Sequence, residues 1–146
     1  MRRNHSALKT ALLLTAALGT SAGASFSAHA AGLGRLTVLS GLGQPLRAEI
    51  EVVSLQKGEA DSLQAKLAPP EAYQQAGVEY ASVLRSLRFD VKQQSEGHYV
   101  ISMTSLQPVN DPFVDVLVEL DWATGRLVRQ FVFLLDPLEY LSLIHI

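Results

Sequence analysis

Histidine and cysteine, the side chains that most often act as bases, nucleophiles and metal ligands, are scarce in this sequence. The chain has four histidines and no cysteine. His5 and His29 lie near its start and His145 near its end, so only His98 remains in the middle. A zinc site or a serine triad needs several such groups to converge, and no G-x-S-x-G elbow is present. The sequence therefore predicts no catalytic, metal-binding or cofactor-binding residues.

Two acidic residues, Glu49 and Glu51, are the next candidates, because a pair of carboxyl groups flanking a glycosidic bond can hydrolyse it. They fall on the same face of one predicted strand, where neighbouring acids rarely converge on one substrate atom. We interpret them as part of a solvated strand face. The glycine-containing segments 32–34 and 41–43 lack the spacing of a phosphate-binding loop.

The overall composition is that of one folded domain. Of 146 residues, 48% are hydrophobic and only 18% are charged, which argues against disorder. The lack of cysteine excludes a disulfide scaffold, a thiolate metal site and a lipid-anchored lipoprotein.

The first thirty residues have the three parts of a secretory signal peptide. Arg2 and Arg3 give a positive start, an apolar run includes residues 11–14, and Ala28-His29-Ala30 is a small-x-small cleavage motif. We expect cleavage between Ala30 and Ala31 and export to a periplasm. Removal of residues 1–30 takes away three of the 12 basic residues and none of the 14 acidic ones, which leaves a net charge near −5. This balance indicates no nucleic-acid partner.

The end of the chain differs in character from the rest. A codon string for residues 141–146 matches a transposon adapter used in sequencing libraries, so we expect these six residues to be an artefact and the natural gene to continue beyond Tyr140. The expected organisation is a signal peptide over 1–30, a β-rich domain over 31–137 and a truncated end over 138–146.

The folded part alternates strand patterns with turn residues. Strands are predicted at residues 35–39, 46–53, 62–67, 88–94, 98–104, 113–122 and 126–135. A helical stripe of Tyr73, Tyr80, Val83 and Leu87 interrupts them, and Gly77 is expected to split it into two short helices. Seven strands with a helical insertion predict a mainly β fold, an immunoglobulin-like β-sandwich, with an α+β layer of sheet and helix as the alternative.

The last two strands are expected to form a hairpin closed by a three-residue loop, with Gly125 in the left-handed conformation. This loop places Leu120 opposite Val128 and Glu119 opposite Arg129, the latter as an ion pair. One hairpin face then supplies the core through Val114, Val116, Val118, Leu120, Trp122, Val128, Val132 and Leu134. The other face carries an apolar strip of Leu117, Leu127, Phe131 and Phe133. Either the helical stripe covers this strip, or the strip is an exposed interaction surface.

Six motifs, in one order along residues 33–137, carry a family resemblance. They are Gly34-Arg35-Leu36-Thr37-Val38, Gly43-Gln44-Pro45-Leu46-Arg47-Ala48-Glu49-Ile50-Glu51, Pro70-Glu71-Ala72-Tyr73 with Gly77-Val78, Pro112-Phe113, Trp122-Ala123-Thr124-Gly125-Arg126-Leu127-Val128-Arg129 and Leu134-Leu135-Asp136-Pro137. The chain thereby resembles the N-terminal periplasmic domain of the FimV family, the polar hub and motility proteins associated with type IV pili. The structural motif residues that we single out from these segments are Gln44, Pro45, Leu46, Glu49, Trp122, Gly125, Arg126 and Arg129.

The resemblance implies a non-enzymatic scaffold domain without cofactors. Its partners would be periplasmic or inner-membrane proteins of the pilus assembly machinery, and its role would lie in pilus assembly, twitching motility and cell-pole organisation. Peptidoglycan would be bound only through a LysM module that this sequence lacks, and a segment outside it would anchor the full-length protein in the inner membrane. A periplasmic module that binds or hydrolyses cell-wall carbohydrate is the alternative, for which Trp122 is the single candidate platform.

Overall fold

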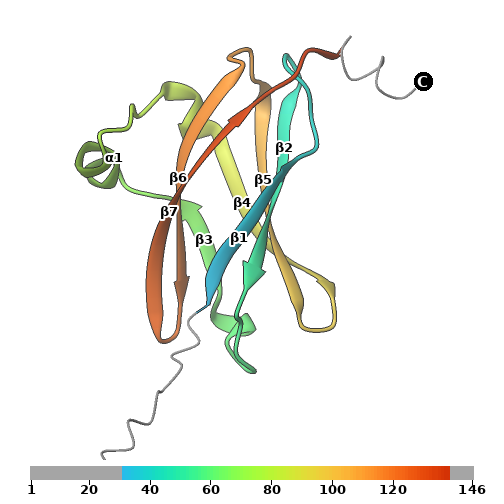
Figure 1. The fold of residues 1–146 in the computed structure, drawn as a ribbon, viewed down its shortest axis with the longest axis vertical. Helices are drawn as coiled ribbons and strands as arrows, with labels where there is room; N and C mark the ends of the chain where they lie inside the picture. Colours follow the sequence, from blue (N-terminus) through green and yellow to red (C-terminus); the bar gives the residue numbers. More distant parts are fainter. Residues whose placement is uncertain (1–30, 139–146) are drawn as a thin grey trace, which may run out of the picture.

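The computed structural model describes residues 31–138, and more than half of them lie in seven strands arranged as two sheets (Figure 1). One antiparallel sheet has the order β1 (Gly32–Val38), β2 (Pro45–Val53), β5 (His98–Pro108) and β4 (Leu87–Ser95). The other has the order β3 (Gln64–Leu67), β6 (Phe113–Trp122) and β7 (Gly125–Leu134), also antiparallel. The expected mainly β architecture is confirmed.

The strand order identifies the kind of sandwich. Four strands in the order 1-2-5-4 facing three in the order 3-6-7 is the arrangement of a constant-type immunoglobulin domain. The prediction of an immunoglobulin-like sandwich is therefore correct, and the α+β layer is wrong. At the sides of the sandwich, β3 lies beside β4 and β1 beside β7.

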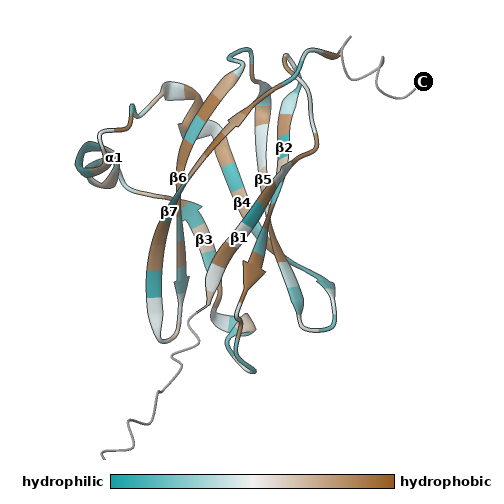
Figure 2. Cartoon of the chain, viewed as in Figure 1, coloured by the Kyte–Doolittle hydropathy of each residue, from teal (hydrophilic) through white to brown (hydrophobic). Residues whose placement is uncertain are grey.

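The core lies between the sheets and consists of alternate residues from the central strands. On β2, Leu46, Ala48 and Ile50 are buried, as the alternation of the sequence predicts. Further side chains meet them from both sheets: Ile101, Met103, Val116, Val118 and Leu120. Figure 2 shows these strands with apolar residues alternating with polar ones. The aliphatic core takes the place of the inter-sheet disulfide found in antibody domains, since this chain has no cysteine.

The link from β3 to β4 carries the helical insertion. Helix α1 (Pro70–Ala76) ends at Gly77, whose φ of 68° is the left-handed conformation that glycine adopts without steric cost. The 3-10 helix η2 (Ser82–Ser86) follows, and a shorter one, η1 (Ala60–Ser62), precedes β3. The predicted split at Gly77 is confirmed. None of the helices within residues 31–138 has the length and apolar character needed to cross a membrane.

The β6–β7 hairpin differs from the prediction by one residue in register. Its loop has two residues, Ala123 and Thr124, so that Trp122 pairs with Gly125 and Leu120 with Leu127. Glu119 faces Val128, and the expected ion pair between Glu119 and Arg129 does not form. Gly125 does not have positive φ. It is needed for another reason: a Cβ there would lie 2.6 Å from Cζ2 of Trp122, whose indole folds over it.

This one-residue shift exchanges the two faces of β7, because successive strand residues point in opposite directions. Phe131 pairs with buried Val116 and lies in the core, with Leu127 and Phe133 packed against the core from the same face. The side chains of Val128, Val132 and Leu134, expected in the core, are exposed.

The predicted signal cleavage site at Ala30 and the suspected adapter residues 141–146 involve chain segments outside the described residues. Ala31 is described, and it is buried directly before β1.

Candidate functional site

Within residues 31–138, potentially catalytic groups do not converge. No cluster of three or more histidines and acids that could hold a metal lies among these residues. His98 is exposed at the start of β5. Glu51 pairs with Arg35 of β1 at 3.3 Å, and both side chains are largely exposed. Glu49, on the same face, is half-buried. The two acids thus belong to the outer surface of the four-stranded sheet.

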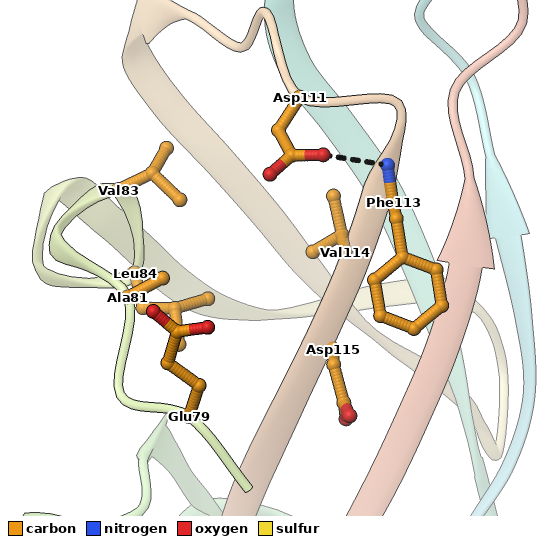
Figure 3. A pocket seen from close by; sticks show the side chains of 8 residues that line it. All are labelled: Glu79, Ala81, Val83, Leu84, Asp111, Phe113, Val114 and Asp115. Carbon is orange, nitrogen blue, oxygen red and sulfur yellow. Dashed lines mark hydrogen bonds between the residues drawn. The ribbon is translucent and has the colours of Figure 1, made fainter.

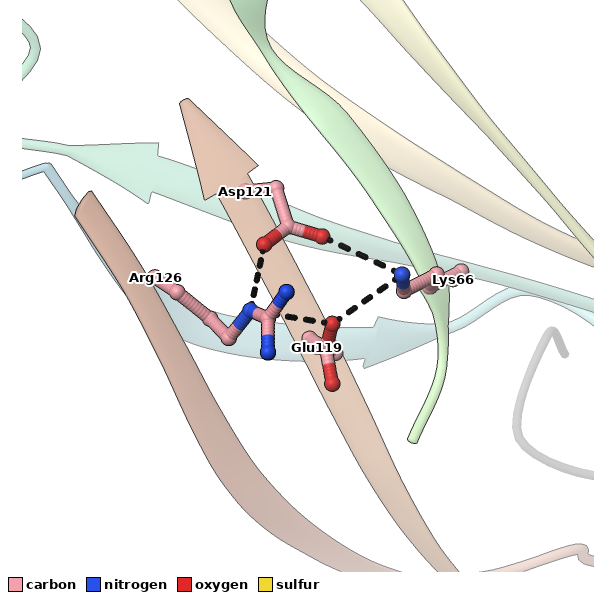
Figure 4. Close-up of polar contacts among 4 residues, drawn as sticks. All are labelled: Lys66, Glu119, Asp121 and Arg126. Atoms are coloured by element: carbon pink, nitrogen blue, oxygen red, sulfur yellow. Dashed lines mark hydrogen bonds and ion pairs between the residues drawn. The ribbon is translucent and has the colours of Figure 1, made fainter. Parts of the chain in front are cut away.

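The main charged cluster lies on the outer face of the three-stranded sheet, with Lys66 on β3, Glu119 and Asp121 on β6, and Arg126 on β7 (Figure 4). Lys66 Nζ lies 3.1 Å from Glu119 and 3.4 Å from Asp121. Arg126 Nε lies 3.3 Å from Glu119 and 2.8 Å from Asp121. Each cation therefore bridges both carboxylates.

The two cations and the two carboxylates of this cluster are paired with one another. The hydrogen bond from Arg126, together with the positive charges of Arg126 and Lys66, lowers the pKa of Asp121. A hydrogen bond to Glu119 raises the pKa of Lys66, and one to Asp121 raises the pKa of Arg126. Glu119 is only 3% exposed, so its charge is accessible to the two cations and hardly to solvent. We interpret the cluster as a clamp across three strands and not as a ligand site.

A second polar contact connects α1 to the middle of β6. The Leu117 N–H donates to the Tyr73 hydroxyl at 2.9 Å, and that hydroxyl in turn donates to the Leu117 carbonyl at 3.4 Å. Strand β3 ends at Leu67, opposite Val118, and therefore stops one residue short of Leu117. The next residue, Ala68, donates its N–H to the Leu117 carbonyl. The Tyr73 hydroxyl therefore supplies the acceptor for the Leu117 N–H, while Ala68 donates to the Leu117 carbonyl. Burial raises the pKa of Tyr73 to about 12.

The Gln-Pro-Leu motif fixes the β1–β2 turn to the neighbouring loop. The Gln44 side chain accepts a hydrogen bond from Gly41 N–H at 3.0 Å, and its carbonyl accepts one from Val109 N–H at 3.0 Å. Pro45 begins β2 opposite Pro108, where neither residue has an N–H to donate. Leu46 is buried, and its N–H donates to the Ser105 hydroxyl at 2.8 Å. These motif residues are structural.

Arg129 is the remaining motif residue of the hairpin, and its contacts differ from the predicted ones. Its guanidinium donates to the carbonyls of Leu33 and Gly34 on β1, and it lies over the ring of Phe131 with 4.9 Å to the centroid. Arg129 thus joins the three-stranded sheet to the first strand of the other sheet. This contact joins residues that are distant in the sequence. The sequence pattern around Arg129 therefore could not predict it.

The predicted interaction strip of Leu117, Leu127, Phe131 and Phe133 does not form one surface. Leu117 lies beneath Tyr73 on the outer face, and Phe131 lies in the core. The exposed apolar side chains of this hairpin are instead Phe113, Val128, Val132 and Leu134. Val128, Val132 and Leu134 were expected in the core because apolar residues occur on both faces of β7, and this pattern alone does not fix the register.

A small groove lies between the segment before η2 and the start of β6 (Figure 3). Glu79, Ala81 and Leu84 line one side, and Asp111 and Asp115 are on the other. The groove encloses about 120 Å³. Pockets for drug-sized ligands run to roughly 300–1,000 Å³. The groove is therefore too small for a ligand of that size.

Comparisons with known proteins agree with the fold. The sequence profile of the FimV N-terminal domain, described as Ig-like, matches residues 31–138. Over 110 residues the chain is 40% identical to the motility hub protein FimV of Pseudomonas aeruginosa, in strains PAO1 and UCBPP-PA14. The aligned part is 75% of this chain but 12% of the relative, so the chain spans a small part of the length of these proteins. No solved structure matches it.

Proposed function

Because this chain belongs to the FimV family, through a match that spans residues 31–138, we propose that it is the periplasmic interaction domain of a FimV-type motility hub. In this role it docks periplasmic or inner-membrane proteins of the pilus assembly machinery. It thereby supports type IV pilus assembly, twitching motility and the organisation of the cell pole. The domain acts by binding and not by catalysis.

The observation that carries this proposal is the 40% identity over 110 residues to a protein named as a motility hub, together with the family match over residues 31–138, which form the sandwich. The motif residues described above hold the strands together: Gln44 fixes a turn, Arg126 belongs to the clamp, and Arg129 joins the sheets. They support a rigid scaffold whose outer surface is free to bind partners.

A domain exchange tests the proposal. The equivalent 110-residue segment of the P. aeruginosa relative would be replaced by the matching segment of this chain, and twitching would be measured on agar. We expect the chimera to restore motility to a strain that lacks the hub protein, whereas a version without the segment does not. A chimera that accumulates to normal levels but behaves like the deletion would refute the proposed role.

Export is part of the same proposal, and a mass measurement tests it. We expect the exported protein to be recovered in the periplasmic fraction with Ala31 as its first residue. Because Ala31 precedes β1, cleavage there leaves the first strand intact. An exported product that begins before Ser25 would reject this assignment.

Sedimentation with purified peptidoglycan separates the proposal from the cell-wall alternative. Trp122 is half-buried against Gly125, so its ring is a poor sugar-binding platform. We expect the protein to stay in the supernatant, and cosedimentation would favour the carbohydrate-binding alternative.

A further inference from the structure

The C-terminal half of β7, residues 130–134, is an unpaired strand edge. We propose that it binds the same edge of a second copy of this chain, so that the two three-stranded sheets join into one continuous six-stranded sheet around a two-fold axis at Val132.

The directions of the backbone groups on β7 follow from three hydrogen bonds at its neighbour β6 and at its own end. Leu117 directs its N–H and C=O away from β7, toward Tyr73 and Ala68. Its partner Gln130 is therefore in a non-hydrogen-bonded pair and directs its own groups away from β6. Independently, Leu135 N–H donates to Pro112 next to β6, so residue 134 points away from β6 as well.

The alternation of the strand extends this result. Gln130, Val132 and Leu134 all direct their N–H and C=O groups outward from the sheet, and within residues 31–138 no other strand pairs with β7 on that side. Strand β1 approaches β7 just before this segment, where Arg129 holds the carbonyls of Leu33 and Gly34, and Leu42 N–H donates to the Asp136 carbonyl just beyond its end. Between these two contacts, the outward backbone groups of residues 130, 132 and 134 have no backbone partner within residues 31–138.

Proteins commonly protect such edges with charges, proline, bulges or short strands. The other three edge strands of the two sheets show these devices. Strand β3 has four residues and carries Lys66, β1 has an irregular register between Leu33 and Leu36, and β4 carries alternating charges. Residues 130–134, Gln-Phe-Val-Phe-Leu, contain no charge, proline or glycine, and the β6–β7 register has no irregularity.

Exposed apolar side chains accompany the free backbone groups. Val132 is 54% exposed and Leu134 is 64% exposed, and Phe113, which pairs with Leu134, is 52% exposed. All three lie on the outer face of the sheet, at the end away from the ion clamp. In Figure 2 this end of β7 is coloured largely brown, the colour of hydrophobic residues. A partner strand would cover part of this surface.

The spacing of the free groups favours a second copy as that strand. In an antiparallel pair centred on Val132, Gln130 lies opposite the partner's Leu134, and Val132 lies opposite its own counterpart. Each opposed pair exchanges two hydrogen bonds, so every outward group of the segment finds a partner. The absence of charge from both copies of the segment avoids repulsion across the new pairing, and the contact is isologous, as closed dimers require.

Cysteine cross-linking of the whole chain tests the register, because the natural sequence has no cysteine. Val132→Cys places two thiols on residues whose Cα atoms are about 5.5 Å apart in such a pair, within disulfide reach. We expect mild oxidation to convert it largely to a covalent dimer. Gln130→Cys or Leu134→Cys alone should stay monomeric on a denaturing gel, since like residues are then about 14 Å apart. An equal mixture of those two variants should give a cross-linked heterodimer.

Leu106→Cys, exposed at the end of β5, measures random collision. Equal cross-linking at residues 132, 130, 134 and 106, or none at 132, would overturn the proposal.

Sedimentation equilibrium gives an independent readout without cysteine. We expect twice the monomer mass for the unmodified chain, the monomer mass for Val132→Lys, and the dimer mass for Val128→Lys, which changes an exposed residue of the same face outside the free segment. A monomeric unmodified chain at its highest soluble concentration would contradict the proposal and leave the edge to a foreign strand.

Discussion

At the scale of single residues, Tyr73 is the side chain on which the helical insertion depends most. Its hydroxyl both accepts from and donates to Leu117 in a buried site. Tyr73→Phe keeps the ring and leaves the Leu117 N–H without a partner, which we expect to lower the free energy of unfolding by about 1–3 kcal/mol. Urea unfolding measures it. Tyr80→Phe is the matched control, because it keeps the edge-to-face contact between the rings at 4.9 Å. Equal stability of Tyr73→Phe and the unmodified protein would show that this bond contributes nothing.

The same residue gives the stability a dependence on alkaline pH. Tyr73 has its pKa raised to about 12 in the folded state. An unfolded tyrosine titrates near 10. Its contribution is complete below pH 10, and it is lost as the pH rises toward 12, because only the unfolded chain ionises in that window. We expect Tyr73→Phe to flatten the fall in stability between these pH values. Absorbance titration of this variant should also lose the tyrosine that ionises near pH 12, and an unchanged titration curve would contradict the burial of this hydroxyl.

Gly125 is required by a close side-chain approach and not by its backbone conformation. A Cβ would lie 2.6 Å from the Trp122 indole, so Gly125→Ala must displace the ring. We expect a loss of about 1–3 kcal/mol, typical of overpacking, in thermal unfolding. Thr124→Ala, in the same loop, should change stability by less than about 0.5 kcal/mol. A neutral Gly125→Ala would mean that the indole moves away without cost.

At the scale of elements, the ion clamp connects β3 to the β6–β7 hairpin, which lies far from it in the sequence. Glu119 is the shared ion-pair partner of Lys66 and Arg126, and it is almost fully buried. Lys66→Met removes one partner and keeps the other, so we expect only a small loss of stability. Glu119→Leu removes the shared carboxylate and leaves two cations beside Asp121 alone. We expect it to cost more than Lys66→Met in the same denaturant series, and the reverse order would contradict the clamp.

The elements also show what the sequence can predict. Seven strands, the helical link and its break at Gly77 followed from local alternation, proline and glycine, because these signals act within a few residues. The register of the last hairpin did not follow. Trp122 packs over Gly125 in the two-residue loop that forms, a contact the sequence does not show, and β7 carries apolar residues on both faces, so alternation fits either register. The partners of Glu119 and Arg129 were missed for a related reason, since Lys66 and Leu33 lie far away in the sequence.

At the scale of the whole molecule, the family assignment and the sandwich are consistent with one account. The motif residues close turns, clamp strands and join the two sheets, and catalytic groups do not gather among residues 31–138. The hairpin of β6 and β7 is central to this account, because its inner face completes the core and the proposed binding surface lies at its exposed edge. The assignment of those two faces is the claim on which the proposed surfaces depend.

Comparison of Phe131→Ala with Val128→Ala in thermal and urea unfolding tests that claim most directly. Phe131 faces the core and Val128 faces solvent on the same strand. We expect Phe131→Ala to lose about 3–5 kcal/mol, the usual cost of deleting a buried aromatic ring. Val128→Ala should stay within about 0.5 kcal/mol of the unmodified protein. A large loss for Val128→Ala together with a small one for Phe131→Ala would show that β7 is turned the other way and would contradict the account.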